Sequence, residues 1–152
     1  MRKKFLLFTA LISTVLGSLY AFNTHNSMEA NNKTEIVFIE QDWTKTQQLA
    51  KENHKLIFVD LYATWCGPCK MLKKNTFTNK EVADFFNANF INASIDVEKG
   101  VGLTLAEQYN VSMLPTLVVT REDGKPVLFT TGYLDPKELM KFAKAAIDKS
   151  KK

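Results

Sequence analysis

The two cysteines of the chain, Cys66 and Cys69, stand where a predicted strand meets a predicted helix. The run Leu56–Tyr62 before them is apolar apart from one acid, which is typical of a buried strand. A helical stretch from about Pro68 to Asn75 follows them. This order of strand, cysteine pair and helix predicts that Cys66 lies at a helix N-terminus.

Four kinds of site use two cysteines at this spacing. A structural disulfide would close a loop of four residues, where the entropy removed from the unfolded chain is close to its minimum. Zinc needs four ligands, and the remaining histidines are His25 in a predicted linker and His54 near a predicted helix end. Covalent haem needs a histidine directly after the second cysteine, where Lys70 stands. A redox-active dithiol is the interpretation that remains, and no metal site is expected.

The predicted helix start distinguishes the two sulfurs. Free backbone N–H groups and the helix dipole stabilise a thiolate at Cys66, while Cys69 lies one turn inside and is suited to resolve a mixed disulfide. Pro68 fits the first turn, because the N–H group that it lacks would have no helical partner there. Trp65 is expected to shield the site with a flat apolar surface, and a core position is its open alternative.

Asp60 lies inside the predicted strand, six positions before Cys66. A carboxylate in such a run loses hydration, so it is satisfied by a partner, exposed by a bend, or functional. We expect it to lie beneath Cys69, with a pKa raised by burial, and to exchange a proton with that thiol. A merely tolerated acid is the alternative.

The rest of the chain predicts one α/β domain with a central sheet and helices on both faces. Further strands are expected at Ile36–Ile39, Phe90–Val97, Thr116–Thr120 and Val127–Thr130, the last two joined as a hairpin through a turn at Gly124. Helices are expected after three capping residues, Asp42, Asn79 and Asp135.

The N-terminal segment is typical of an export signal. Residues 1–21 combine a basic start, an apolar run and small residues, and predict a signal peptide cleaved after Ala21 or an uncleaved anchor. Residues 22–34 are expected to form a linker, 35–149 the domain and 150–152 a tail. Without Arg2, Lys3 and Lys4, the net charge of +4 falls to +1, which does not indicate nucleic-acid binding.

Several motifs together resemble the thioredoxin superfamily across roughly residues 35–149. They are the run from Val59 to Lys70 that contains W-C-G-P-C-K, the distant Leu114-Pro115-Thr116, Gly124 and Gly132. Residues 60–63, 76–82 and Leu114 are most similar to the C-terminal domain of DsbD-type thiol:disulfide interchange proteins. The Gly67-Pro68 dipeptide is instead that of thioredoxin itself.

The resemblance implies a thioredoxin fold, a central mixed sheet with helices on both faces that ends in a hairpin and a helix. It implies that Cys66 is the nucleophile, Cys69 the resolving thiol and Asp60 the buried acid. Pro115 is expected to be cis and to face the disulfide, and the backbone of Leu114 to pair with an extended substrate. Trp65, Gly67 and Pro68 complete the expected substrate-binding residues.

Three positions depart from the family pattern. Asn92 stands where thioredoxins usually carry a lysine near the buried acid, so the charge partner of Asp60 is open. Lys74 replaces the proline that often kinks the active-site helix, with the break expected at Asn75–Asn79. Met113 stands at a position often held by glycine, next to the substrate groove.

The dipeptide between the cysteines bears on the direction of electron flow. Gly67-Pro68 adds no charge near the thiolate, and Lys70 and Lys73 are expected to be solvated and screened. We therefore expect a monomeric periplasmic or otherwise extracytoplasmic reductase of protein disulfides or oxidised thiols. It needs no cofactor beyond its own disulfide, and a DsbD-type membrane donor would supply its electrons. The alternatives are an oxidase or isomerase for secreted proteins, and a non-catalytic binding module.

Overall fold

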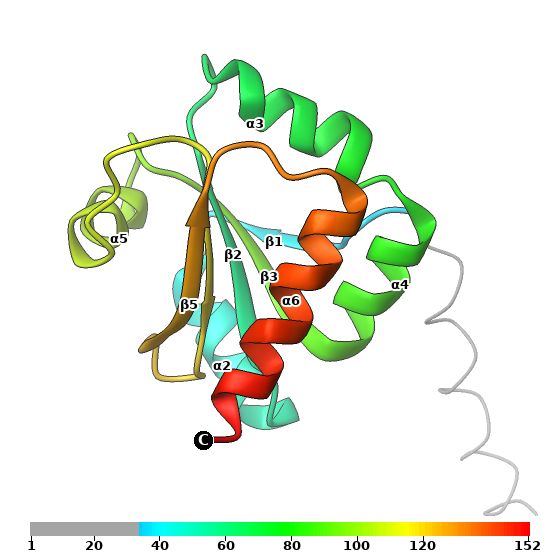
Figure 1. Cartoon of the computed structure of the whole chain (residues 1–152). Coiled ribbons are helices and arrows are strands. Elements are labelled where there is room, and N and C mark those ends of the chain that lie inside the picture. The colour runs from blue at the N-terminus through cyan, green and yellow to red at the C-terminus, as the bar shows by residue number, and fades with distance from the viewer. Residues whose placement is uncertain (1–33) are drawn as a thin grey trace, which may run out of the picture. The chain divides into compact units, whose positions relative to one another are not determined.

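The computed structural model describes residues 34–152, and the predicted signal peptide and nearly all of the predicted linker lie outside this range. Helical segments separate most of the strands in the described part of the chain (Figure 1). Their order is β1 (Phe38–Glu40), α2 (Trp43–Asn53), β2 (Leu56–Tyr62), α3 (Gly67–Met71), η2 (Leu72–Thr76), α4 (Lys80–Asn89), β3 (Phe90–Asp96), α5 (Val101–Gln108), β4 (Thr116–Thr120), β5 (Pro126–Thr131) and α6 (Pro136–Ser150).

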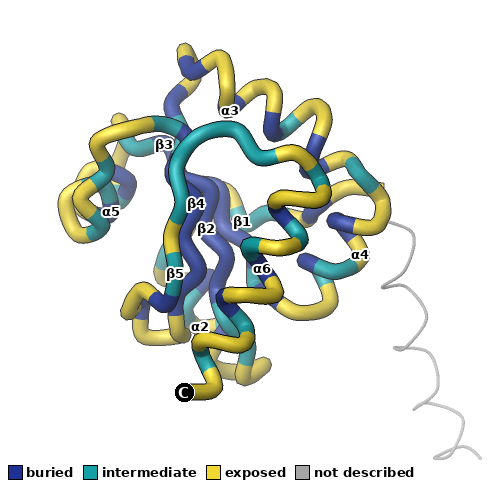
Figure 2. The backbone as a smooth tube through the Cα atoms, viewed as in Figure 1, coloured by how far each residue is buried: buried dark blue, intermediate teal, exposed yellow. Residues whose placement is uncertain are grey.

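The five strands form one mixed sheet in the order β1-β3-β2-β4-β5. Strands β1, β2 and β3 run parallel, whereas β4 pairs antiparallel with β2 and β5 pairs antiparallel with β4. The central strand β2 is buried from Ile57 to Leu61, as its apolar run predicts. Figure 2 shows the buried strands enclosed by helices whose outer surfaces are exposed.

Alternate residues of β2 face two separate cores. Ile57, Val59 and Leu61 pack with residues of α2 and α5 on one face. Phe58 packs on the other face, in a cluster with residues of η2, α4 and α6. Because strand side chains alternate, Asp60 points to the same face as Phe58. Helices therefore cover both faces of the sheet, and Asp60 lies on the face that η2 covers.

The predicted helix caps are confirmed. The side chains of Asp42 and Asn79 accept hydrogen bonds from the backbone N–H groups of Lys45 (2.9 Å) and Val82 (3.1 Å). Asp135 forms a reciprocal capping box with Glu138 at the start of α6. These local hydrogen bonds satisfy N–H groups that have no partner within the helix, which is why short polar residues predict where helices begin.

Helix α5 was not predicted from the sequence. It begins after Gly100, whose φ is 47°, and has no side-chain cap. A Cβ at Gly102 would lie 1.9 Å from the carbonyl oxygen of Asp96, so α5 packs against the end of β3 too closely for a side chain. The start of this helix depends on backbone packing and not on a capping residue.

The active-site helix changes its hydrogen-bonding pattern part of the way along. After α3, the backbone widens into the π-helical turn η2, and the Phe77 N–H donates to the Leu72 carbonyl at 2.9 Å. The helix runs through Lys74 and ends at Thr76, so the break lies within the predicted region. The π turn is the segment that carries Lys73.

Candidate active site

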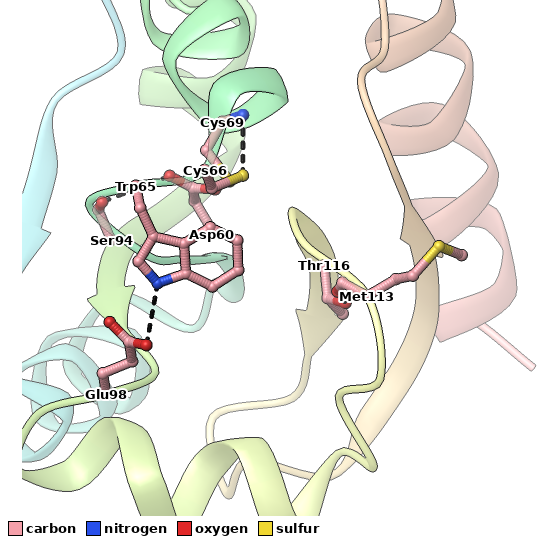
Figure 3. Close-up of a disulfide and its surroundings, with 8 residues drawn as sticks. All are labelled: Asp60, Trp65, Cys66, Cys69, Ser94, Glu98, Met113 and Thr116. Atoms are coloured by element: carbon pink, nitrogen blue, oxygen red, sulfur yellow. Dashed lines mark hydrogen bonds between the residues drawn. A yellow bond between two sulfur atoms is a disulfide. The ribbon is translucent and has the colours of Figure 1, made fainter.

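Cys66 and Cys69 form a disulfide at the start of α3, with their Cα atoms 5.4 Å apart. Cys66 is the N-cap residue, and its Sγ accepts a hydrogen bond from the Cys69 backbone N–H at 3.2 Å (Figure 3). Both residues are almost fully buried, at 3% and 2% exposure. Exposure therefore does not distinguish the two sulfurs, but the helix N-terminus does, since its N–H groups favour a negative charge on Cys66.

The loop before β4 packs against the disulfide. Leu114 is half-buried and contacts the small apolar cluster that Ala63, Cys66 and Cys69 form. The Leu114–Pro115 peptide bond is cis, as expected from the sequence. The Thr116 hydroxyl donates to the Met113 carbonyl at 2.7 Å and closes the loop. Segments nearly fifty residues apart in sequence thus meet at the disulfide.

Exposed residues surround the buried sulfurs. Gly67 and Pro68 are exposed, and Trp65 is 67% exposed, so Trp65 is not a core residue. Its indole N–H donates to Glu98 Oε1 at 2.9 Å (Figure 3). Met113 is 61% exposed. The rim of the site therefore offers apolar surface, with Trp65 held by the loop after β3.

Asp60 is buried on β2, at 1% exposure. Its Oδ2 accepts a hydrogen bond from the Ser94 hydroxyl at 3.4 Å, and its Oδ1 has no hydrogen-bond partner among residues 34–152. Burial raises the pKa of Asp60 to about 7, and the charge of Lys73 and the Ser94 hydrogen bond oppose this rise. A carboxyl group with such a pKa is ionised in part near neutral pH, as a proton acceptor and donor must be.

Asn92 is not a partner of Asp60. Strand register pairs Asp60 with Ser94 and Phe58 with Asn92. Asn92 therefore lies two residues before Ser94 on β3, on the same face of the sheet. The Asn92 amide donates to the Val37 carbonyl and to Asn87 Oδ1, each at 3.3 Å. The position that carries lysine in the family pattern therefore ties β3 to the residue before β1 and to α4.

The cation near Asp60 comes from the active-site helix. Lys73 is half-buried on η2, and its Nζ lies 3.7 Å from the centroid of the Tyr62 ring. The expectation that Lys73 is solvated and screened was wrong, because the ring of Tyr62 holds the ammonium close to the protein. Lys70 is exposed, as expected. Lys73 is thus the cation whose charge lowers the pKa of Asp60.

Sequence patterns missed four residues of this site, Ser94, Lys73, Tyr62 and Glu98. Ser94 meets Asp60 through the β2–β3 register, and Lys73 meets Tyr62 across the contact of helix and sheet. Neither relation follows from local spacing. The only sequence signal for this contact was a lysine four residues after Cys69. The direction in which that side chain points depends on the π turn, which the sequence did not predict.

Two further properties concern residues 34–152. In this range no three His, Cys, Asp or Glu side chains lie close enough together to hold a metal ion. Within the same residues, every helix is too short or too polar to span a membrane.

Comparison with known proteins agrees with this geometry. The sequence model of the Thioredoxin-like domain family matches residues 43–147. A solved structure from Bacteroides thetaiotaomicron, described as a putative disulphide-isomerase, is 39% identical with a TM-score of 0.68, covering 75% of this chain and 94% of that one. Thioredoxin-1 of Drosophila melanogaster is 36% identical, covering 55% of this chain and 73% of its own length.

A relative with a different domain organisation extends the comparison. The thiol:disulfide interchange protein DsbD of Tatumella citrea is 33% identical over 62% of this chain, but the match covers only 17% of that protein. The similarity to DsbD thus concerns one thioredoxin-like part of a longer protein. The chain belongs to the thioredoxin-like domain family and is a thiol-disulfide oxidoreductase whose redox pair is Cys66–Cys69.

Proposed function

We propose that the chain reduces disulfides in proteins outside the cytoplasm, with Cys66 as nucleophile, Cys69 as resolving thiol and Asp60 as proton acceptor. The observation that carries this proposal is the cysteine pair at the start of α3, on the face of the sheet where Asp60 is buried without a full set of partners. No cofactor beyond the redox pair enters the proposed reaction.

The proposed reaction has two displacement steps. The Cys66 thiolate attacks one sulfur of a substrate disulfide, forms a mixed disulfide and releases the other substrate sulfur as a thiolate. Cys69 then transfers its proton to the Asp60 carboxylate, and its thiolate attacks the Cys66 sulfur. The mixed disulfide breaks, the second substrate sulfur leaves as a thiolate, and the Cys66–Cys69 disulfide forms. Two electrons thereby pass from the dithiol to the substrate.

The exposed rim is the proposed substrate-binding surface. Trp65, Gly67 and Pro68 would contact the substrate around the sulfur that is attacked. Leu114 precedes β4 beside the disulfide, where its backbone would pair with an extended substrate segment. Backbone pairing of this kind depends little on substrate side chains, so it suits a reductase of many proteins.

The proposed direction and location depend on two sequence features. Gly67-Pro68 brings no charged group between the sulfurs, so the dipeptide does not add to the stabilisation of the Cys66 thiolate that favours an oxidant. Residues 1–21 have the composition of an export signal, cleaved or retained as an anchor. A dithiol spent outside the cytoplasm must be reduced again there, and the DsbD match supports a membrane thiol donor of that type.

Disulfide isomerisation is the second candidate. The 39% identical structure from Bacteroides thetaiotaomicron is described as a putative disulphide-isomerase. An isomerase uses the same Cys66 attack but returns the mixed disulfide to the substrate instead of resolving it through Cys69. A Cys69→Ala variant separates the two, because it abolishes net reduction and leaves isomerisation intact.

Substrate trapping tests the proposal. Cys69→Ala, expressed with the full N-terminal segment, should accumulate proteins as mixed disulfides on Cys66 in the extracytoplasmic fraction, and Cys66→Ser should accumulate none. The purified wild type should reduce insulin with dithiothreitol as electron source. Refolding of scrambled ribonuclease by Cys69→Ala, together with failure of the wild type to reduce insulin, would favour the isomerase.

A further inference from the structure

Lys73 is held in place between the active-site helix and the sheet. It lies on the π turn η2, and its ammonium lies 3.7 Å from the centroid of the Tyr62 ring. Tyr62 is two residues after Asp60 on β2, so both side chains point toward the face that η2 covers. A lysine packed on an aromatic ring loses part of its hydration, and its charge acts more strongly on neighbours than that of a solvated lysine.

The charged and titratable groups around Asp60 come from several elements. Register places Ser94 of β3 beside Asp60, and Glu40 of β1 beside Ser94. Asp96 of β3 pairs with Tyr62, and Tyr62 packs against the apolar cluster that contains Cys69 of α3. Lys73 lowers the pKa of Asp60, and Glu40 raises it. Lys73 lowers the pKa of Asp96 as well, so its charge acts on both strands.

We propose that the Lys73 ammonium, seated on the Tyr62 ring, is the positioning charge that stabilises the buried Asp60 carboxylate and so controls proton transfer from Cys69. The inference depends on the proposed role of Asp60 as proton acceptor. Asp60 can accept the Cys69 proton only in its ionised form, and burial opposes that form, with no second hydrogen-bond partner in the described part of the chain. Lys73 supplies the opposite charge that makes the ionised form accessible near neutral pH.

The effect of removing this charge has a definite sign. Lys73→Gln keeps most of the side-chain stem but raises the pKa of Asp60, so a smaller fraction of Asp60 is ionised at pH 7. Resolution of a mixed disulfide by Cys69 then slows at pH 7 and recovers at higher pH. The pH profile moves to higher pH, whereas a purely structural loss would lower the rate at every pH.

The experiment compares Lys73→Gln with Lys74→Gln, an exposed lysine on the same π turn. The chemical shift of the Asp60 carboxyl carbon is followed by NMR between pH 4 and 10 and assigned with the help of Asp60→Asn. It gives the titration midpoint of Asp60, the pH at which the carboxyl group is half ionised. The decay of a preformed mixed disulfide on Cys66, measured by rapid quenching and mass spectrometry, gives the rate of resolution. The rate measured over the same pH range gives the midpoint of its pH profile. We expect Lys73→Gln to raise both midpoints, Lys73→Arg to restore them and Lys74→Gln to leave them unchanged.

A second variant keeps the inference testable if Lys73→Gln fails to fold. Tyr62→Leu keeps the lysine and removes its aromatic support, so it should raise both midpoints by less than Lys73→Gln does. Equal Asp60 midpoints in wild type, Lys73→Gln and Tyr62→Leu would overturn the inference.

The double variant separates this inference from the proposed function. In an Asp60→Asn background, Lys73→Gln should not shift the pH profile of resolution further, and an undiminished shift there would overturn the route through Asp60. If Asp60→Asn alone resolves the mixed disulfide as fast as wild type at every pH, the proposed role of Asp60 fails. If Asp60→Asn is slow but Lys73→Gln matches Lys74→Gln, only the role of Lys73 fails.

Discussion

Asp60 and Asp96 are two buried carboxyl groups on neighbouring strands, and their pKa values shift in opposite directions. Each is 1% exposed. Burial raises the pKa of Asp60 to about 7. The pKa of Asp96 is lowered, because the Lys99 ammonium pairs with its Oδ2 at 2.8 Å and the Glu98 backbone N–H donates to its Oδ1 at 3.1 Å.

The difference lies in what acts on each carboxyl group: burial is the largest cause of the Asp60 shift, whereas the hydrogen bond from Lys99 is the largest cause of the Asp96 shift. Among residues 34–152, Asp60 has one hydrogen bond of 3.4 Å and no partner for its Oδ1, and a cation is held on a neighbouring ring. Asp96 has an ion pair and a backbone hydrogen bond that hold its charged form. A buried acid that keeps its charge stabilises local structure, whereas one whose charge is weakly supported can exchange a proton. The two strand ends thus carry a structural acid and a candidate catalytic one.

The largest expected contrast is in catalysis. Asp60→Asn should slow resolution of the mixed disulfide at neutral pH by about 10²- to 10⁴-fold, the usual contribution of a positioned acid or base. Asp96→Asn should leave the rate unchanged, because Asp96 is committed to Lys99 and Glu98. Quenched-flow measurement of the mixed disulfide checks both variants. Equal effects of the two substitutions would contradict the assignment of roles.

The second contrast is in the pH dependence of stability. The pKa of Asp60 rises from its ordinary 3.8 to about 7 on folding. The folded protein therefore keeps a proton that the unfolded chain gives up, and stability falls as pH rises from about 4 to 7, by up to about 4 kcal/mol. Asp60→Asn removes this loss and should be the more stable protein at pH 8. Urea unfolding of the oxidised forms at pH 4 and 8 measures it, and a stability difference independent of pH would refute it.

Asp96 should show the opposite and smaller dependence. Its lowered pKa contributes stability above the ordinary carboxyl range, and this contribution disappears as pH falls through the folded-state pKa. Asp96→Asn should therefore be less stable than wild type at neutral pH and should approach it in acid. The effect stays below that of Asp60→Asn because Lys99 is largely exposed to solvent. If urea unfolding showed Asp96→Asn to be as stable as wild type at neutral pH but less stable in acid, the structural role of Asp96 would be wrong.

The smallest expected effect concerns the rim of the site. The backbone of Glu98 donates to Asp96, and its side chain accepts the Trp65 indole N–H, so Asp96 supports Trp65 indirectly. Glu98→Ala should lower the fluorescence anisotropy of Trp65, measured in a Trp43→Phe background, and Asp96→Asn should lower it less. Both changes should leave the Asp60 midpoint near its wild-type value. Unchanged anisotropy in Glu98→Ala would show that this hydrogen bond does not order Trp65.

Much of the fold follows from local patterns in the sequence. The bounds of β2 and β4 match the prediction, and β3 ends one residue earlier than predicted. Apolar runs and capping residues act within a few positions, so they can be recognised without knowledge of the fold. Strand β1 begins at Phe38 instead of Ile36, and α5 was missed because glycine and backbone contact define its start.

The site divides in the same way. The cysteine pair, Asp60 and the Leu114–Pro115 segment could be predicted, because strand order, helix position and the family motif indicate them. The hydrogen bond of Ser94 and the ring contact of Lys73 could not, since they depend on strand register and on the π turn. Those long-range contacts oppose the rise that burial causes in the pKa of Asp60.

The reduction potential of the Cys66–Cys69 pair decides whether the protein is a reductase or an oxidant. Equilibration of the purified domain with glutathione at pH 7, read by the redox state of the two cysteines, gives the value. A reductase should have a potential near that of thioredoxin, at about −270 mV, where the dithiol reduces protein disulfides. A value near about −120 mV, where the disulfide acts as a strong oxidant, would contradict the proposed reductase function.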